Sequence, residues 1–324
     1  MEKILITAVI GGILSGVLGL ILLPLLRALK AGQSVRDIGP TWHNSKAGTP
    51  LMGGLMFIGA AVVCLVVNLV SLTEYTVFYV LALSLCFGLV GFLDDFCKVK
   101  FKRDLGLTAI QKALLQMAVS ALYLYLLYKE GSLSCNIYIP FVDVSISMHP
   151  LAYIFFAMFV MVGCVNAVNL TDGVDGLCGS VTVPVMVFFT VAAYAMGRQD
   201  LALLPACLIG GLIAYLFFNW HPAKVFMGDT GSLFLGGVVC AMAFALDMPL
   251  ILILVGFVYI VETLSDIIQV AYFKATHGKR IFKMAPIHHH FEMCGWKEVK
   301  IVIVFTAASA LACLLAWFGV SGRI

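Results

Sequence analysis

The chain has 324 residues, of which 62% are hydrophobic and 11% are charged. Its mean hydropathy of +1.06 lies far above the values of water-soluble globular proteins, so the composition excludes that class and indicates a polytopic membrane protein. The formal net charge is +3, too small to suggest a nucleic-acid partner, and we expect none.

Ten segments are apolar and long enough to cross a bilayer as helices, which takes about 20 residues each. They cover residues 4–26, 51–71, 75–93, 107–128, 151–169, 179–196, 201–219, 231–247, 249–272 and 299–320. The first segment lacks the cleavage site of a signal peptide, so we interpret it as a span. No long linker or clear repeat divides the chain. We therefore predict an all-α fold in a single integral-membrane domain, residues 1–324.

Basic residues are distributed unevenly between the two sets of loops. Most of the 20 Lys and Arg residues follow odd-numbered segments or lie at the helix ends beside those loops. Because basic loops remain in the cytoplasm, we predict that these loops are cytoplasmic and that both termini lie outside. The longest outward loop, residues 131–150, contains near-alternating β-branched residues at 136–147. We predict a short extracytoplasmic β-hairpin there, with a structural role.

Five predicted cytoplasmic loops concentrate the polar residues that phosphate-transferring enzymes use. In the first, residues 36–54, Lys46 and exposed backbone N–H groups could hold phosphate oxygens. A basic loop with turn glycines is the alternative.

The second loop begins with adjacent carboxylates at the end of the third segment, Asp94 and Asp95. Two carboxylates at a membrane boundary repel each other and resist loss of hydration, so a metal ion or another cation would stabilise them. A solvated helix end is the alternative. Lys98 and Lys112 flank the pair and could bind phosphates or anchor the chain at the membrane surface.

The third loop places Asn169, Asp172 and Asp175 at a spacing of three, and helical or turn geometry would gather them on one side. A plain interhelical turn is the alternative interpretation. It requires neither the repeated Asp nor the Asn.

In the fourth loop, Asp229 lies between glycines and resembles a ligand of a hard cation such as Mg²⁺. A helix N-cap is the alternative for this residue. Asn219 and Phe226 could recognise a base by amide pairing and ring stacking, although Phe226 could equally pack at the membrane interface.

The fifth loop contains three consecutive histidines, 288–290, which we interpret as donors to a diphosphate rather than zinc ligands, because nearby Cys or Asp ligands at zinc spacing are missing. A solvated loop remains the alternative. Within the ninth segment, Glu262, Asp266 and Gln269 share one helical face. They would line a cavity or pair internally.

Taken together, these loops resemble the phospho-N-acetylmuramoyl-pentapeptide transferase family, one of the polyprenyl-phosphate N-acetylhexosamine-1-phosphate transferases. The resemblance covers the whole chain and rests on Lys-Ala-Gly-Thr-Pro-Leu-Met-Gly-Gly at 46–54, the aspartate pair at 94–95, Asn-Leu-Thr-Asp-Gly at 169–173, Phe-Met-Gly-Asp-Thr-Gly-Ser at 226–232 and Pro-Ile-His-His-His-Phe-Glu at 286–292. One departure is Leu51, where the family more often has Thr. It removes a hydroxyl but no expected charge.

The resemblance implies transfer of phospho-MurNAc-pentapeptide from UDP-MurNAc-pentapeptide to undecaprenyl phosphate, which gives lipid I and UMP in the first membrane step of peptidoglycan synthesis. It further implies a Mg²⁺ cofactor, a homodimer, and a multi-pass protein of the bacterial plasma membrane whose active site faces the cytoplasm. A secondary transporter and a membrane scaffold are the interpretations from other classes. The polar groups lie at helix ends rather than at the bilayer midplane, which disfavours a transporter.

By motif, the resemblance also implies individual roles. Asp229 would be the metal ligand. The catalytic residues would be Asp94, Asp95, Asp229, His288 and His289, and the substrate-binding residues Lys46, Lys98, Lys112, Asn169, Asp172, Asp175, Asn219, Phe226 and Gln269. The acceptor is a phosphate monoester whose second pKa should be about 6, so it is mostly ionised near neutral pH. We therefore favour direct in-line attack, with a covalent aspartyl intermediate as the rival.

Overall fold

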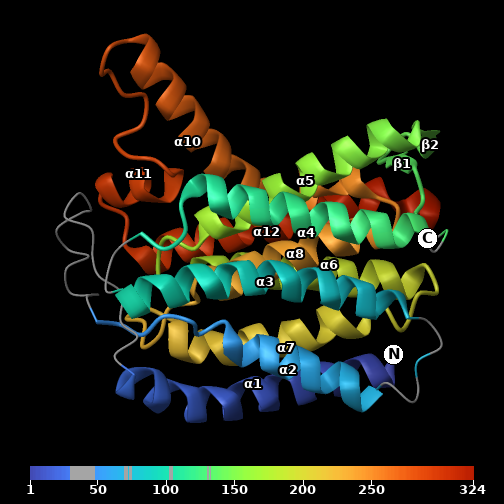
Figure 1. Cartoon of the computed structure of the whole chain (residues 1–324), viewed down its shortest axis with the longest axis horizontal. Helices are drawn as coiled ribbons and strands as arrows, with labels where there is room; N and C mark the ends of the chain where they lie inside the picture. The colour runs from blue at the N-terminus through green and yellow to red at the C-terminus, as the bar shows by residue number, and fades with distance from the viewer. Residues whose placement is uncertain (30–47, 69–71, 73–74, 102–104, 130, 132) are drawn as a thin grey trace.

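The computed structural model describes residues 1–29, 48–68, 72, 75–101, 105–129, 131 and 133–324. Most of its helices lie side by side in one bundle, while the helix of residues 257–275 projects from it (Figure 1). The helices are α1 (Glu2–Ala28), α2 (Leu55–Asn68), α3 (Thr76–Phe101), α4 (Ala109–Lys129), α5 (Pro150–Thr171), α6 (Leu177–Ala195), α7 (Leu203–Asn219), α8 (Gly228–Ala245), α9 (Leu252–Val255), α10 (Phe257–Ala275), α11 (Ile287–Met293) and α12 (Glu298–Gly319), with short 3₁₀ turns η3 (Pro249–Ile251) and η4 (Ser321–Arg323).

Helix α8 is the centre of the bundle. Almost all of its side chains are buried, and α3 and α5 make extensive contacts with it, while α1 packs mainly on α7. Small residues line the contacts of α8, and small residues let helix backbones approach closely where no water drives the association. This close packing places the first turn of α8 against the last turns of α3.

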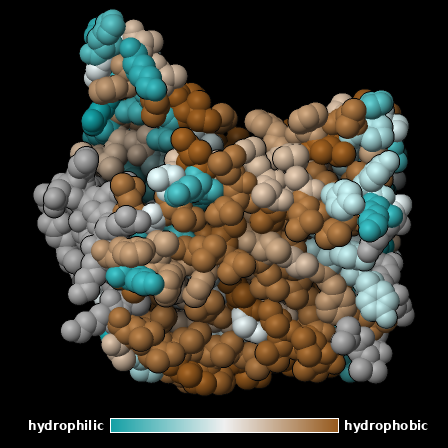
Figure 2. Space-filling model, viewed as in Figure 1, coloured by the Kyte–Doolittle hydropathy of each residue, from teal (hydrophilic) through white to brown (hydrophobic). Residues whose placement is uncertain are grey.

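The outer surface of the bundle is apolar. Large hydrophobic side chains are exposed along α1, α4, α5 and α12, and Figure 2 shows a broad hydrophobic surface across the middle of the molecule with hydrophilic residues toward its ends. Apolar side chains that are exposed in this way suit a lipid environment. The chain is therefore an all-α polytopic membrane protein, as the composition predicted.

Every predicted segment contains a helix, but the lengths differ from the expectation of ten spans. Within the described residues, seven helices are long and apolar enough to cross a membrane, or up to eight if α9 and α10 form one bent span. Helices α2 and α7 are shorter than this limit. The predicted segment 249–272 is broken in the structure, because the stretch Pro249–Val255, which contains η3 and α9, meets α10 at an angle of 81° around Gly256.

The two ends of the bundle differ in structure. Both termini lie at the same end as strands β1 (Asn136–Ile139) and β2 (Val144–Ser147), and α11 lies at the opposite end (Figure 1). The strands pair antiparallel with Asn136 opposite Ser147 and Ile139 opposite Val144. The end that carries α11 also carries the last turns of α3 and the first turn of α8, so it holds the polar motifs.

Candidate active site

Three aspartates meet where α3 and α8 cross. Asp94 and Asp95 come from α3 and Asp229 from α8, and each offers one carboxylate oxygen within 4.8 Å of the other two. The sequence predicted a loop around both positions, but both helices extend further: α3 continues to Phe101 and α8 begins at Gly228. The carboxylates are therefore held by helical backbone, which fixes their relative positions more tightly than loops would.

Two lysines lie against the three aspartates. Lys98 Nζ lies 2.6 Å from Asp94 Oδ2, 3.6 Å from Asp95 Oδ1 and 3.3 Å from Asp229 Oδ2. Lys112 Nζ on α4 lies 2.7 Å from Asp229 Oδ2. Both ammonium groups thus lie against the three aspartates, and phosphate binding by the two lysines stays a prediction. The site combines oxygen ligands for a hard cation with positive groups for phosphate oxygens.

The carboxylate of Asp95 is hydrogen-bonded to the first turn of α8. Its carboxylate accepts hydrogen bonds from Asp229 N at 3.2 Å, Thr230 N at 2.9 Å and Thr230 Oγ1 at 2.7 Å. A carboxylate at a helix N-terminus satisfies N–H groups that lack a partner within the helix. Because only 1% of the Asp95 side chain is exposed, against 18% for Asp229, Asp229 is the more accessible carboxylate.

Asn169, in the last turn of α5, connects the cluster to a third helix. Its Nδ2 donates to Asp229 Oδ1 at 2.9 Å and to Ser232 Oγ at 2.8 Å, and its Oδ1 accepts from Lys112 Nζ at 3.3 Å. The amide therefore orients both Asp229 and Lys112.

Asp172 follows α5 directly and has an unusual acidity. Loss of hydration on burial, followed by the negative charges of Asp229, Asp95 and Asp175, raises the pKa of its carboxyl to about 8. A carboxyl with this pKa binds a proton in the absence of a cation at neutral pH. A cation bound nearby would favour the ionised form instead.

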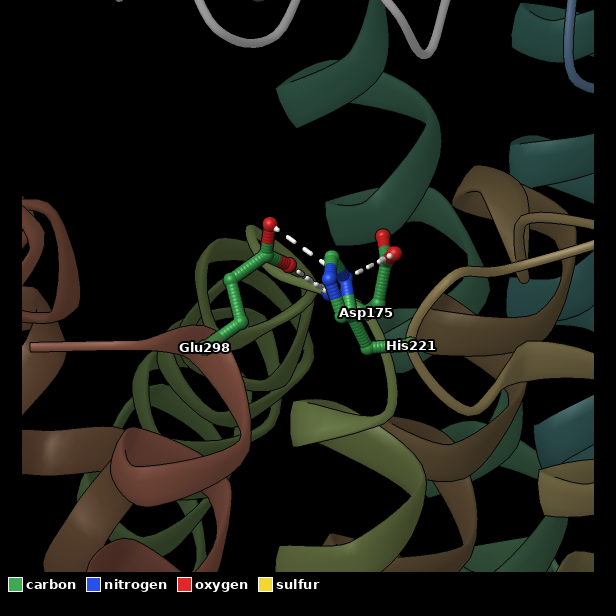
Figure 3. Close-up of side chains that lie close together, drawn as sticks. All are labelled: Asp175, His221 and Glu298. Carbon is green, nitrogen blue, oxygen red and sulfur yellow. Dashed lines mark hydrogen bonds and ion pairs between the residues drawn. The ribbon is translucent and has the colours of Figure 1, made fainter.

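Asp175 takes part in a different set of contacts from Asn169. Its Oδ2 lies 3.0 Å from His221 Nδ1 and accepts from Ala223 N at 3.0 Å. Glu298 Oε2 accepts from Asp175 N at 3.0 Å, and Glu298 Oε1 lies 3.6 Å from His221 Nδ1. Figure 3 shows the imidazole between the two carboxylates. Three segments distant in sequence are joined there.

The amide of Asn219 is used by backbone groups. Its Oδ1 accepts from Gly176 N at 3.0 Å, and its Nδ2 donates to Val225 O at 2.8 Å. The side chain thus joins the α5–α6 turn to the α7–α8 loop. Recognition of a base by this amide stays a prediction. Phe226, half-buried in the same loop, receives a backbone bond at its carbonyl from Gly53 N at 2.8 Å.

The histidine motif forms the short helix α11 rather than the predicted loop. His288 Nδ1 lies 2.9 Å from Glu262 Oε2 of α10, and His289 Nδ1 lies 2.6 Å from Glu292 Oε2. Gln269 of α10 binds backbone instead, with Phe282 N donating to its Oε1 at 3.0 Å and its Nε2 donating to Phe282 O at 2.9 Å.

Sequence reasoning did not assign His221, Glu298 and Glu292 to the site, and it left Glu262 between cavity lining and internal pairing. A lone His or Glu carries no local signal, and only the helical spacing of Glu262 and Gln269 indicated a shared face. Lys46 lies outside the described residues.

The family model described as Glycosyl transferase family 4 matches residues 77–247, the part of the chain from α3 to the end of α8. The fold and the site thus define an integral-membrane member of this glycosyl transferase family.

Three relatives are each called phospho-N-acetylmuramoyl-pentapeptide-transferase. The protein from Clostridium perfringens is 49% identical over 97% of this chain and 98% of its own length. The protein from Clostridium acetobutylicum is 44% identical over 98% and 99%. The protein from Bacillus subtilis is 43% identical over 97% of each. The chain therefore belongs to the phospho-N-acetylmuramoyl-pentapeptide transferase family.

Proposed function

We propose that this chain transfers phospho-MurNAc-pentapeptide from UDP-MurNAc-pentapeptide to undecaprenyl phosphate at the cytoplasmic face of the bacterial plasma membrane, releasing UMP and forming lipid I. The observation that carries the proposal is the cluster of Asp94, Asp95 and Asp229 in contact with Lys98 and Lys112. Both reactants are anions, so the site must overcome their repulsion before phosphorus and nucleophile can meet.

We propose Mg²⁺ as the cofactor, with Asp229 as its principal ligand and Asp94 beside it. The three carboxylate oxygens within 4.8 Å of one another fit a hard divalent cation. When bound, Mg²⁺ would shield phosphate charge and stabilise the charge that develops in transfer.

The residues of the chain have separate tasks in the proposed mechanism. Lys98 and Lys112 exchange their carboxylate partners for phosphate oxygens as the substrates enter. Asp94 orients the lipid phosphate or removes its residual proton, and its Oδ1 is fixed by Leu107 N at 2.8 Å. Asp95 acts indirectly, by holding the backbone of Asp229 and Thr230. Direct in-line attack is consistent with these tasks, because an oxygen of the lipid phosphate would form the new bond to phosphorus as UMP is displaced, and no aspartate would have to bond to phosphorus.

The test is release of UMP from UDP-MurNAc-pentapeptide by the purified protein in detergent or vesicles, with and without undecaprenyl phosphate and Mg²⁺. We expect release to require both undecaprenyl phosphate and Mg²⁺, and Asp229→Asn to lose at least about 100-fold in kcat, as expected when a transition-state charge partner is removed. Full activity of Asp229→Asn at saturating Mg²⁺ would refute the metal assignment. UMP release without lipid, with a sugar-phosphate adduct on the protein, would support the covalent route instead. Sedimentation of the same sample tests the expected homodimer.

A further inference from the structure

Two neighbouring histidines each have a glutamate carboxylate beside the same ring atom, Nδ1. Glu262 Oε2 lies 2.9 Å from Nδ1 of His288, and Glu292 Oε2 lies 2.6 Å from Nδ1 of His289. The imidazole centroids are 4.1 Å apart and the rings cross at 62°. A carboxylate at Nδ1 keeps the proton on that nitrogen and leaves Nε2 as the nitrogen that faces other groups.

The pair of Glu262 and His288 is enclosed by protein. The side chains are 0% and 1% exposed, respectively. Glu262 comes from α10, two turns beyond the bend, and His288 comes from α11, so the contact joins two elements that are separated by the 276–286 segment. Among the described residues, neither Glu262 Oε1 nor His288 Nε2 has a hydrogen-bond partner.

Such unpaired atoms are costly. A buried polar atom without a partner destabilises a fold by about 1–3 kcal/mol, and native proteins retain few of them outside functional sites. Stability alone would favour an apolar pair at this position. The retained pair therefore indicates that the imidazole serves another group.

The position of His288 identifies that group. A Cβ added to Gly173 would lie 2.1 Å from His288 Nε2 and 2.4 Å from Cε1. The imidazole thus packs directly on the backbone of Gly173, next to Asp172, and no side chain fits between them. Asp172 in turn experiences the charges of Asp229 and Asp95.

We propose that Glu262 is a positioning residue: it fixes the orientation of His288, and His288 in turn holds the Asp172–Gly173 turn against the acidic cluster. Glu292 orients His289 in the same manner. The inference rests on the proposed function for its kinetic consequence and deepens it, because it assigns a role in phosphate transfer to two glutamates outside the cluster.

A double-mutant cycle tests whether Glu262 acts through His288. The variants are Glu262→Ala, His288→Ala and the double variant, with kcat/KM for UMP release as the readout. In metal sites, loss of the group that orients a histidine typically costs about 10–100-fold, and we expect a loss of the same order for Glu262→Ala in the wild-type background. With His288 already replaced, the same change should cost less than about threefold. Equal losses in both backgrounds would show a merely structural role and overturn the proposal.

Two further variants sharpen the cycle. Glu262→Gln keeps the side-chain volume and still accepts a hydrogen bond from His288 Nδ1. The decrease in log(kcat/KM) for Glu262→Gln should therefore be at most half of the decrease for Glu262→Ala. Asp266→Asn, one turn further along α10, is the matched control and should change kcat/KM less than twofold. A loss of the same size in Asp266→Asn as in Glu262→Ala would contradict the assignment.

A readout without substrates separates this inference from the proposed reaction. Diethyl pyrocarbonate modifies accessible imidazoles, and mass spectrometry reports each histidine. We expect slow modification of His288 in the wild type and at least fivefold faster modification in Glu262→Ala, because the ring is freed, while exposed His277 stays unchanged. Unchanged modification of His288 would overturn the inference even if UMP is released. Absence of UMP release by the wild type would refute the proposed function alone.

Discussion

Replacing Gly91 with Ala should separate α3 from α8 at the active site. A Cβ at this position would lie 2.1 Å from the carbonyl oxygen of Asp229 and 2.3 Å from its carbonyl carbon. Since real Cβ atoms keep at least 3.0 Å from such atoms, the two backbones must move apart by about 0.9 Å, the difference between 3.0 and 2.1 Å. Both neighbours are backbone atoms, so no side-chain rotation can relieve the contact.

The displacement can be followed into the site. The bonds from Asp229 N and Thr230 N to Asp95, now 3.2 and 2.9 Å, would lengthen to about 4.1 and 3.8 Å, beyond hydrogen-bonding range. Overpacking costs about 1–3 kcal/mol of stability, of which the better helix propensity of Ala recovers about 1 kcal/mol. A misplacement of about 1 Å costs about 100-fold in rate. Activity should therefore fall much further than stability.

The assay is UMP release together with thermal unfolding of the detergent-solubilised protein. Gly163→Ala is the matched control, because it also adds a methyl group to a helical glycine and meets nothing within 4 Å. We expect about a 100-fold loss of kcat for Gly91→Ala and less than a twofold change for Gly163→Ala. If folded Gly91→Ala protein keeps the wild-type kcat, the close approach of α3 and α8 does not determine the geometry of the active site, and the reasoning is refuted.

Two further predictions concern the α5–α6 turn. The folded-state pKa of Asp172 is raised to about 8 from 3.8, so ionisation of this carboxyl destabilises the fold as pH rises between these values. In EDTA, the Tm of Asp172→Asn should therefore exceed that of the wild type by a margin that grows from pH 5 to pH 8, and a constant margin would contradict this. Glu298→Gln weakens the charge-assisted bond from Asp175 N, and Asp175 is one of the expected substrate-binding residues, so the KM for UDP-MurNAc-pentapeptide should rise about tenfold, with kcat changed less than threefold; an unchanged KM would exclude a substrate-binding role for this contact.

Much of the architecture could be predicted from the sequence because hydropathy is a local property. Every apolar segment contains a helix, and Lys98 contacts Asp94 and Asp95, the pair that it was expected to flank. Lys112, expected beside the same pair, contacts Asp229 instead. The helix ends were less predictable. Polar residues at the ends of α3 and α8 suggested loops, but the contacts between the helices compensate the buried carboxylates and let both helices continue through them.

The sequence by itself determined the class of protein, the helical segments and the candidate acids, since composition and motif spacing are sufficient for these. Only the tertiary structure decided the bend of 81° between α9 and α10 and the commitment of Asn219 to backbone groups. It also decided the pairing of His288 with Glu262, which lies 26 residues earlier in the chain. Such contacts depend on how α10 and α11 return to the bundle, and no local pattern of residues encodes that path.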